Sequence, residues 1–310
     1  MQVLVTAILA QVGSVVLGKP NEIRLALACL LAKGHLLIED LPGMGKTTLA
    51  QVLAQTLGLS YQRTQFTSDL LPADVIGISI FNPDTKKFEL HRGPIFNQVV
   101  LSDEINRASP KTQSALLEAM EEHQVSIDGT TYPLPQPFFV IATQNPLIHA
   151  GTYPLPESQL DRFMMRISLG FPDIAAEKQI LQSESSHASY KKLLPCVDTD
   201  KLIAMQAAVS QVTVSDNIID YVIALNHVSR QQGFAGRPLS PRAGQALVAA
   251  AKAWAFIDER TYVIPEDIQT VFSSVCQHRL ELTTLGFGEQ QDKISAQVIA
   301  QVNVLNPLNP

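Results

Sequence analysis

The sequence predicts an α/β fold in which a parallel sheet covered by helices is followed by a smaller, all-helical domain. In the first half of the 310-residue chain, short apolar runs alternate with segments of helical periodicity, as in such a sheet. A glycine-containing loop at residues 43–48 joins the first apolar run to a helix, which is typical of phosphate-binding sheets. After residues 171–173 the strand signals stop, and amphipathic helices follow one another.

Five strands are predicted, at residues 35–39, 61–65, 99–101, 138–143 and 165–169. Two hairpins interrupt them. In the first, Ile78 and Ile80 are expected to face Phe88 and Leu90 across a turn at 82–85. In the second, an apolar run at 125–127 leads into an Asp-Gly turn. The hairpins are either structural additions to the sheet or elements that take part in the function.

After residue 173 the chain is expected to consist of consecutive helices. One predicted helix begins at Ser240-Pro241 and another at Pro265-Glu266, because proline is favoured in the first helical turn. We therefore expect a nucleotide-binding core at 1–172, a helical lid at 173–283 and a tail at 284–310 that can form a helix. An earlier helix has four apolar residues on one face, namely Ile218, Ile219, Val222 and Leu225.

Composition and charge disfavour several classes of function. The net charge of −6 gives no basic field, so nucleic acid is unlikely as the main ligand. The three cysteines lie far apart in apolar surroundings, as expected of packed thiols in a reducing compartment. No uninterrupted apolar stretch is long enough to span a membrane. We expect a cytoplasmic protein, with no membrane span.

The loop at 43–48 has the chemistry of a phosphate site. Backbone N–H groups at a helix N-terminus face a bound phosphate, Lys46 adds a positive charge and Thr47 offers a hydroxyl to Mg²⁺. ATP with Mg²⁺ is therefore the expected ligand. Asp40 stands where the general pattern of this loop has glycine. The predicted contacts with the nucleotide are made by Pro42, Gly43, Met44, Gly45, Lys46, Thr47 and Thr48.

Polar residues follow two further predicted strands. Asp103 and Glu104 end the strand that begins at residue 99; Asp103 is expected to hold the Mg²⁺ through water, and Glu104 to polarise the attacking water. Asn145 follows the strand at 138–143 and is expected to bind the γ-phosphate or that water. Taken singly, these residues could equally be a solvated strand end and a turn.

Four segments together resemble the AAA+ ATPases of the MoxR branch, over nearly the whole chain. The Asp at position 40 is common in that branch. The resemblance implies a P-loop αβα core with a five-stranded parallel sheet, a helical lid and assembly of a homo-oligomeric ring, for which we expect a hexamer. The four segments are GMGKTT at 43–48, DEINRA at 103–108, ATQNP at 142–146 and LPESQLDRF at 155–163.

The resemblance also implies roles for two arginines and an adenine contact. Arg162 resembles the arginine finger that reaches the γ-phosphate of a neighbouring subunit; the alternative is a surface ion pair with Asp161 or Glu157. Arg242, after Ser240-Pro241, resembles the sensor-2 arginine of the lid, although the preceding loop departs from the pattern of the branch. Val16 and Gly18 correspond to the adenine contact.

Three functions remain open at this point. The first is an ATPase that remodels or activates protein partners, which the resemblance implies are proteins with a von Willebrand factor A domain. The exposed acidic candidates for such a contact are Asp84, Glu89 and Asp128. The others are the ATPase subunit of a metal chelatase and a nucleic-acid motor, although only Lys86 and Lys87 are basic near a hairpin tip.

Overall fold

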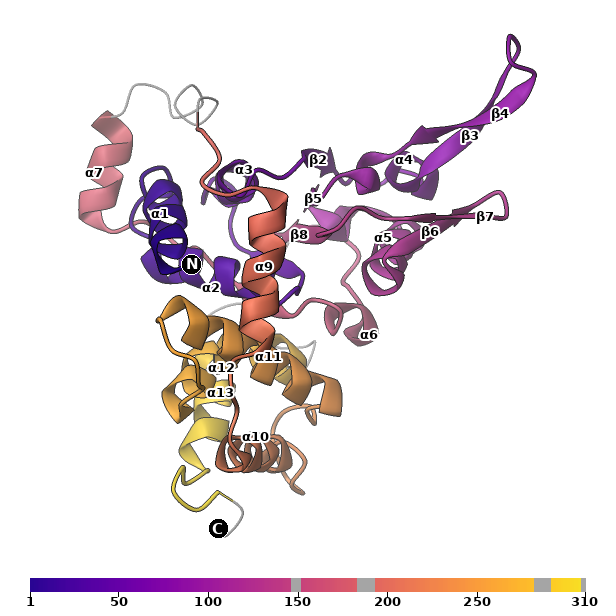
Figure 1. Cartoon of the computed structure of the whole chain (residues 1–310). Coiled ribbons are helices and arrows are strands. Elements are labelled where there is room, and N and C mark those ends of the chain that lie inside the picture. Colours follow the sequence, from indigo (N-terminus) through magenta and orange to yellow (C-terminus); the bar gives the residue numbers. More distant parts are fainter. Residues whose placement is uncertain (146–151, 183–192, 282–290, 308–310) are drawn as a thin grey trace.

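A five-stranded parallel sheet with helices on both faces forms the upper part of the molecule in Figure 1, and a group of helices lies below it. The computed structural model describes residues 1–145, 152–182, 193–281 and 291–307. The strand order is β2-β5-β8-β1-β9. The strands are β1 (Leu36–Glu39), β2 (Tyr61–Gln65), β5 (Val99–Asp103), β8 (Phe139–Gln144) and β9 (Met165–Ile167). The predicted fold class is confirmed.

Alternating side chains of the sheet enter two separate apolar cores. Leu36 and Ile38 of β1 pack into one core with α2 and α3, whereas Leu37 packs into the other, beneath α5. Successive residues of a strand point to opposite faces, so a strand that is apolar throughout requires helices on both sides. The helices of this part are α1 (Gln2–Gly13), α2 (Pro20–Leu31), α3 (Lys46–Thr56), α4 (Pro72–Ile76), α5 (Pro110–Glu122) and α6 (Glu157–Leu160), with short 3₁₀ turns at Pro94–Phe96 and Ile105–Arg107.

From residue 173 onward, the regular structure of the described chain is helical, apart from one isolated bridge between Thr213 and Tyr262. Ser240 caps the helix that it was expected to begin, since its hydroxyl accepts the Ala243 N–H at 3.2 Å. In the C-terminal tail, Ile294 and Val298 are buried against the preceding helices. The expected boundary at 283 and 284 lies outside the described residues. The helices are α7 (Ile174–Gln182), α9 (Thr199–Ser210), α10 (Asp216–Val228), α11 (Pro241–Ile257), α12 (Pro265–Leu280) and α13 (Gln291–Ala300).

Both predicted hairpins are present, but the expected register of the first is wrong. They consist of β3 (Gly77–Asn82) with β4 (Lys87–Arg92), and β6 (Gln124–Ile127) with β7 (Thr130–Pro133). Ile78 and Ile80 lie opposite His91 and Glu89, so Phe88 and Leu90 are on the other face. The prediction assumed one buried face, which fixes register. The β3–β4 hairpin instead projects from the body of the protein, and Phe88 is 73% exposed (Figure 1).

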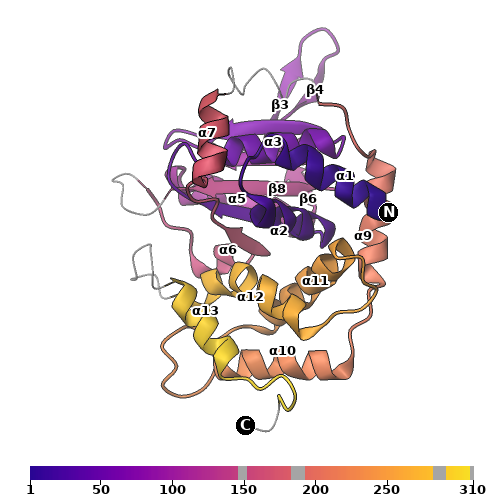
Figure 2. The ribbon, with the colours of Figure 1, turned by 90° about the vertical axis from the view of Figure 1, so that its left-hand side faces the viewer.

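Figure 2 shows the same two layers from the side, with α10 at the end remote from the β3–β4 hairpin. Among the helices of the described segments, none combines the length and the apolar composition needed to cross a membrane.

Candidate nucleotide-binding site

The loop at residues 43–48 connects the end of β1 to the start of α3. Gly43 and Gly45 have φ angles of 86° and 87°, a left-handed conformation that favours glycine. Gly45 directly precedes the helix, and Lys46 is its first residue. The loop therefore brings free N–H groups at a helix N-terminus to the carboxyl edge of the sheet, where phosphate is favoured.

The side chain of Lys46 reaches from the loop into the edge of the sheet. It is 8% exposed, and its ammonium donates to the Asp40 carbonyl at 2.6 Å and to Asn145 Oδ1 at 3.0 Å. Burial lowers the pKa of Lys46, and the nearby carboxylates of Asp40 and Asp103 oppose that shift. A phosphate group placed here would add the negative charge that favours the ammonium form.

Asp40, the residue that departs from the general loop pattern, holds the loop to the neighbouring strand end. Its Oδ2 accepts the backbone N–H groups of Leu169 and Gly170 at 2.7 and 2.6 Å, and the Ser168 hydroxyl at 3.1 Å. Its Oδ1 accepts the N–H of Leu41 at 2.8 Å. Glycine at this position would leave the N–H groups after β9 without these acceptors. Asp40 is thus a clamp between the phosphate loop and the segment leading to α7.

Asp103 lies at the end of β5, directly beside the end of β8. Its Oδ1 accepts the Thr143 hydroxyl at 2.5 Å, and its Oδ2 accepts two N–H groups of Arg63, the shorter contact being 2.6 Å. Arg63 comes from β2, the neighbour of β5 in the sheet. The carboxylate is therefore held in one orientation from both sides. Together with the Thr47 hydroxyl, it offers the oxygen ligands that Mg²⁺ prefers.

Glu104 occupies a left-handed conformation, with a φ of 55° that is uncommon for a residue with a side chain. Its carboxylate accepts two hydrogen bonds of 2.9 Å, from Asn145 Nδ2 and Gln65 Nε2, and forms an ion pair with Arg107 Nε at 2.9 Å. Its backbone N–H donates to the Thr143 hydroxyl at 2.9 Å. The turn of the chain after β5 thus aims the carboxylate back toward the loop.

Asn145 bridges the two chemical parts of this edge. Its amide oxygen accepts from Lys46 and its amide nitrogen donates to Glu104, so one side chain joins the phosphate loop to the acidic strand end. The following Pro146, part of the predicted motif, lies outside the described residues. Lys46, Asp103, Glu104 and Asn145, predicted separately from three strand ends, are therefore brought together.

A buried chain of polar groups runs behind this site toward the lid helices. Gln144 donates to Glu39 at 2.6 Å, and Arg166 joins Glu39 at 2.9 Å to Glu281 at 2.6 Å. Glu281 directly follows α12. Burial raises the pKa of Glu39, and the guanidinium of Arg166 opposes that shift. The residues next to Asp40 and Asn145 are thus linked by ion pairs to the end of α12.

The two arginines predicted to act on the nucleotide lie away from the phosphate loop and next to each other. Arg162 and Arg242 share the carboxylate of Glu121, at 3.0 and 3.2 Å. The alternative partners expected for Arg162 were wrong, because Asp161 pairs with Arg279 and Glu157 with Arg237. The prediction considered only neighbours in sequence, whereas Glu121 comes from the end of α5.

This arginine cluster is at the opposite end of β1 from the phosphate loop. Arg162, Arg242 and Glu121 line a cavity of ≈ 340 Å³ together with Gly34 and His35, which precede β1. The loop follows β1 instead, and a four-residue strand spans about 13 Å. Arg242 and Lys46 therefore serve different edges of the sheet within one chain.

Val16 and Gly18 lie on the loop side, next to the segment that Asp40 clamps. Val16 is buried in the core. Gly18 has a φ of 71°, and a Cβ placed on it would lie 2.7 Å from the Cβ of Ala176 in α7. Glycine is thus required here by packing, which accounts for the residue without reference to adenine.

Sequence reasoning missed the residues that hold the acidic groups in place, namely Arg63, Gln65, Thr143 and Glu121. One signal was available. Gln65 ends a predicted strand and is paired with Asp103 in the sheet register, so the strand order would have placed it at the site. Glu121 carried no such signal, because its contacts depend on the packing of three elements. These are α5, α11 and the segment that follows α6.

Comparison with known proteins agrees with this geometry. The family described as "ATPase family associated with various cellular activities (AAA)" matches residues 35–165, and the AAA lid domain matches residues 235–301. The uncharacterized protein YeaC of Bacillus subtilis is 44% identical over 94% of this chain and 92% of its own. Chaperone MoxR1 of Mycobacterium tuberculosis is 37% identical over 93% of this chain and 78% of its own.

A solved structure is similar over almost the full length. The crystal structure of a Cytophaga hutchinsonii protein assigned as an ATPase has a TM-score of 0.86 and 36% identity, and the match covers 97% of this chain and 95% of that one. With a phosphate loop, an acidic strand end and a matching lid in place, the chain belongs to the MoxR family of AAA+ ATPases, and it hydrolyses ATP.

Proposed function

We propose that this protein is a ring-forming, Mg²⁺-dependent ATPase of the cytoplasm that acts on protein partners in a chaperone-like manner. The observation that carries the proposal is the division of the predicted site between two edges of the sheet. Lys46, Glu104 and Asn145 form one group, and Arg162 and Arg242 form another beyond the far end of β1. The relative named Chaperone MoxR1 supports the chaperone-like role.

At the loop edge, each residue has a distinct task in hydrolysis. The loop from Pro42 to Thr48 and the Lys46 ammonium hold the phosphates, while Thr47 and the fixed carboxylate of Asp103, the latter through water, hold the Mg²⁺ that neutralises developing charge. Glu104 accepts the proton of the attacking water, and Asn145 positions the γ-phosphate. Because Glu104 and Lys46 share Asn145 as a partner, a nucleotide that engages Lys46 also releases or reorients Glu104.

At the arginine edge, Arg162 and Arg242 act on the nucleotide of a neighbouring copy. A single chain places both groups too far from its own loop, whereas a head-to-tail ring places the arginine edge of one copy against the loop edge of the next. Both guanidinium groups are partly exposed and held on one carboxylate, so they can exchange Glu121 for phosphate. We propose a hexamer.

The partner is proposed to be a folded protein with a von Willebrand factor A domain. Such a domain holds a divalent ion that can accept an incoming carboxylate. Asp84, Glu89 and Asp128 are exposed at the hairpins, as expected, and the β3–β4 hairpin projects from the body (Figure 1). Asn82 and Thr85 donate to Glu89 at 2.9 and 2.8 Å, which leaves Asp84 as the freer carboxylate at the tip.

The experiment is capture of partners from the native cell by immobilised Glu104→Gln protein, loaded with ATP or with ADP. We expect a von Willebrand factor A protein to be enriched in the ATP state, and the purified partner to stimulate turnover by the wild type. Asp84→Asn should weaken capture, whereas Lys86→Gln, a matched change at the same tip, should not. Recovery of nucleic acid or of chelatase subunits instead would reject the protein-partner proposal and support one of those functions.

A further inference from the structure

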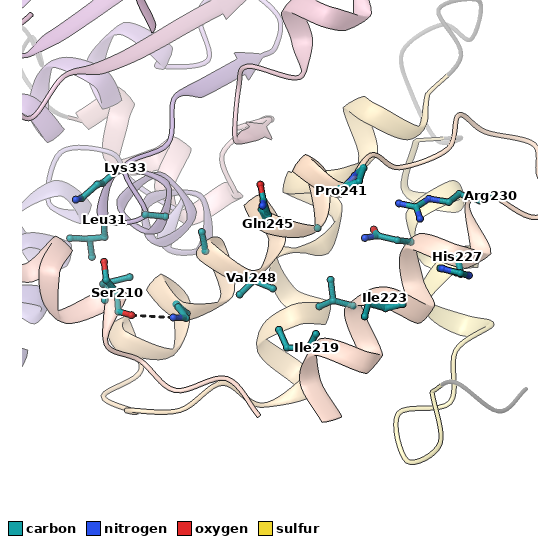
Figure 3. A pocket seen from close by; sticks show the side chains of 17 residues that line it. Leu31, Lys33, Ser210, Ile219, Ile223, His227, Arg230, Pro241, Gln245 and Val248 are labelled. Atoms are coloured by element: carbon teal, nitrogen blue, oxygen red, sulfur yellow. Dashed lines mark hydrogen bonds between the residues drawn. The ribbon is translucent and has the colours of Figure 1, made fainter. Parts of the chain in front are cut away.

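An open groove lies in the lower part of the molecule, away from both groups of site residues. Its volume is ≈ 730 Å³, and it is lined by the facing sides of α10 and α11, the end of α9 and the end of α2. Figure 3 shows Ile219, Ile223 and Val248 pointing into it. The function described above uses none of these residues.

The charge of the groove has one sign. Among its lining residues in the described chain, Lys33, His227, Arg230 and Lys252 are basic, and no lining residue is acidic. Lys33 and Arg230 lie at its two ends in Figure 3. An apolar floor with basic ends is complementary to an apolar helix that carries carboxylates.

A helix of that kind is exposed on the same chain. In α7, Ile174 and Leu181 are 87% and 80% exposed and lie seven residues apart, hence on one face. Phe171, just before the helix, is also exposed. Residues 173–182 carry the carboxylates of Asp173 and Glu177 against one lysine; Asp173 caps the helix by accepting the Ala176 N–H at 2.7 Å, and Glu177 lies in its first turn. Exposed apolar side chains grouped in this way mark an interaction surface.

The helix cannot enter the groove of its own chain. In Figures 1 and 2, α7 lies at the top of the molecule beside the core, whereas α10 lies at the bottom. Asp40 holds the segment before α7 to the phosphate loop, and Gly18 packs against Ala176. The helix is therefore fixed on the loop side of the sheet.

The groove, in contrast, is continuous with the arginine cluster. Lys33, Gln245 and Ala249 line both the groove and the cavity that contains Arg162 and Arg242. A contact that brings the arginines of one copy to the loop of the next therefore brings α7 of that next copy toward the groove of the first.

We propose that α7 of a second copy of this chain docks in the groove between α10 and α11, with Ile174 and Leu181 on its apolar floor. The inference rests on the proposed head-to-tail ring and identifies a contact that would hold the ring together. It gives the clamp by Asp40 a second role, because the loop that binds phosphate also fixes the helix that binds the neighbour.

The test is photo-crosslinking in the purified full-length protein with ATP. A p-benzoylphenylalanine residue at position 181 is expected to link two copies, with the attached peptide mapping to α10 or α11. The native Leu181 is largely exposed, so the change does not threaten the fold. Crosslinks that map elsewhere, or a protein that stays monomeric under conditions of full ATP turnover, would overturn the proposal.

A pair of matched substitutions gives an independent readout. We expect Leu181→Asp to raise the protein concentration needed for assembly at least about tenfold, and Phe88→Asp, an equivalent change at an exposed apolar residue of the β3–β4 hairpin, to leave it unchanged. Equal effects of the two would contradict the proposal. If loop and arginine variants complement each other while Leu181→Asp assembles normally, the head-to-tail ring stands and this contact alone is wrong.

Discussion

The two ends of β1 differ in the kind of site that they carry. At its carboxyl end, Lys46 and Asp103 are buried and each is held by several short hydrogen bonds. At its amino end, Arg162 and Arg242 are partly exposed and are held on one shared carboxylate. The first end holds fixed polar groups suited to phosphate, whereas the second offers partly exposed positive charge.

Under the proposed function, neither edge is a complete catalytic site. Phosphoryl transfer needs a cradle, a metal and positive charge against the γ-phosphate in the transition state. In the proposed function, the loop edge provides the first two together with Lys46, and the arginine edge provides the remaining charge. Two copies in contact would complete the site, so that turnover depends on assembly.

The largest effect is expected from a substitution at the loop edge. Lys46→Ala removes the buried ammonium that is proposed to contact the phosphates, and it leaves the Asp40 carbonyl and Asn145 Oδ1 without this donor. We expect ATP affinity to fall by at least about 100-fold, as measured by a fluorescent nucleotide analogue. Arg162→Ala is the matched loss of a cation at the other edge and should change affinity less than tenfold. Equal losses would show that the two edges do not differ in this way.

The next substitution separates the chemical step from nucleotide binding at the loop edge. Glu104→Gln keeps the size of the side chain and removes the base. We expect kcat to fall by about 100- to 1,000-fold, while the Kd for ATP changes less than threefold. Single-turnover hydrolysis and equilibrium binding measure the two quantities. Turnover near that of the wild type would remove Glu104 from the catalytic role.

A third effect, on stability and not on activity, concerns His35 beside the arginine edge. Its Nδ1 accepts the Val140 N–H at 3.0 Å and its Nε2 lies 3.3 Å from the Met120 carbonyl, so the buried ring must be neutral. Burial lowers the pKa of His35 to about 4, from 6.5 in the unfolded chain. The stabilisation is therefore fully present above pH 6.5 and is lost as the pH falls toward 4, by about 3 kcal/mol in total.

Urea unfolding between pH 7 and 4.5 checks this expectation. The free energy of unfolding of the wild type minus that of His35→Gln should decline by up to about 1.4 kcal/mol per pH unit below pH 6. Parallel pH dependences of the two proteins would mean that His35 is not the titrating group.

The sequence was sufficient to predict the features that depend on local pattern and on the parallel arrangement of the strands. The strand at 61–65 was predicted with its observed bounds, and the other four within two residues at each end. Three of the five, β1, β5 and β8, are apolar runs ended by polar residues. Lys46, Asp103, Glu104 and Asn145 could be grouped in advance, since the carboxyl ends of parallel strands meet at one edge. Whether they act as predicted is for the variants above to test.

Tertiary packing decided what the sequence could not show. The partners of Arg162 and Arg242 depend on where α5 ends relative to α6 and α11, and no local pattern encodes Glu121 as their common acceptor. The register of the β3–β4 hairpin was mispredicted because neither of its faces is buried. Asp40 was noticed as a departure from a motif, but its role as a clamp needed the position of the chain after β9.

The central claim, that one copy completes the site of another, is tested most directly by mixing two inactive variants. Lys46→Ala lacks a working loop edge and Arg162→Ala lacks the arginine finger. In randomly mixed rings at equal amounts, about a quarter of interfaces would pair an intact loop with an intact arginine, so turnover should recover. Mixing Lys46→Ala with Glu104→Gln, two lesions of the same edge, is the matched control and should recover nothing. Co-assembled Lys46→Ala and Arg162→Ala subunits that remain as inactive as either alone would contradict the account.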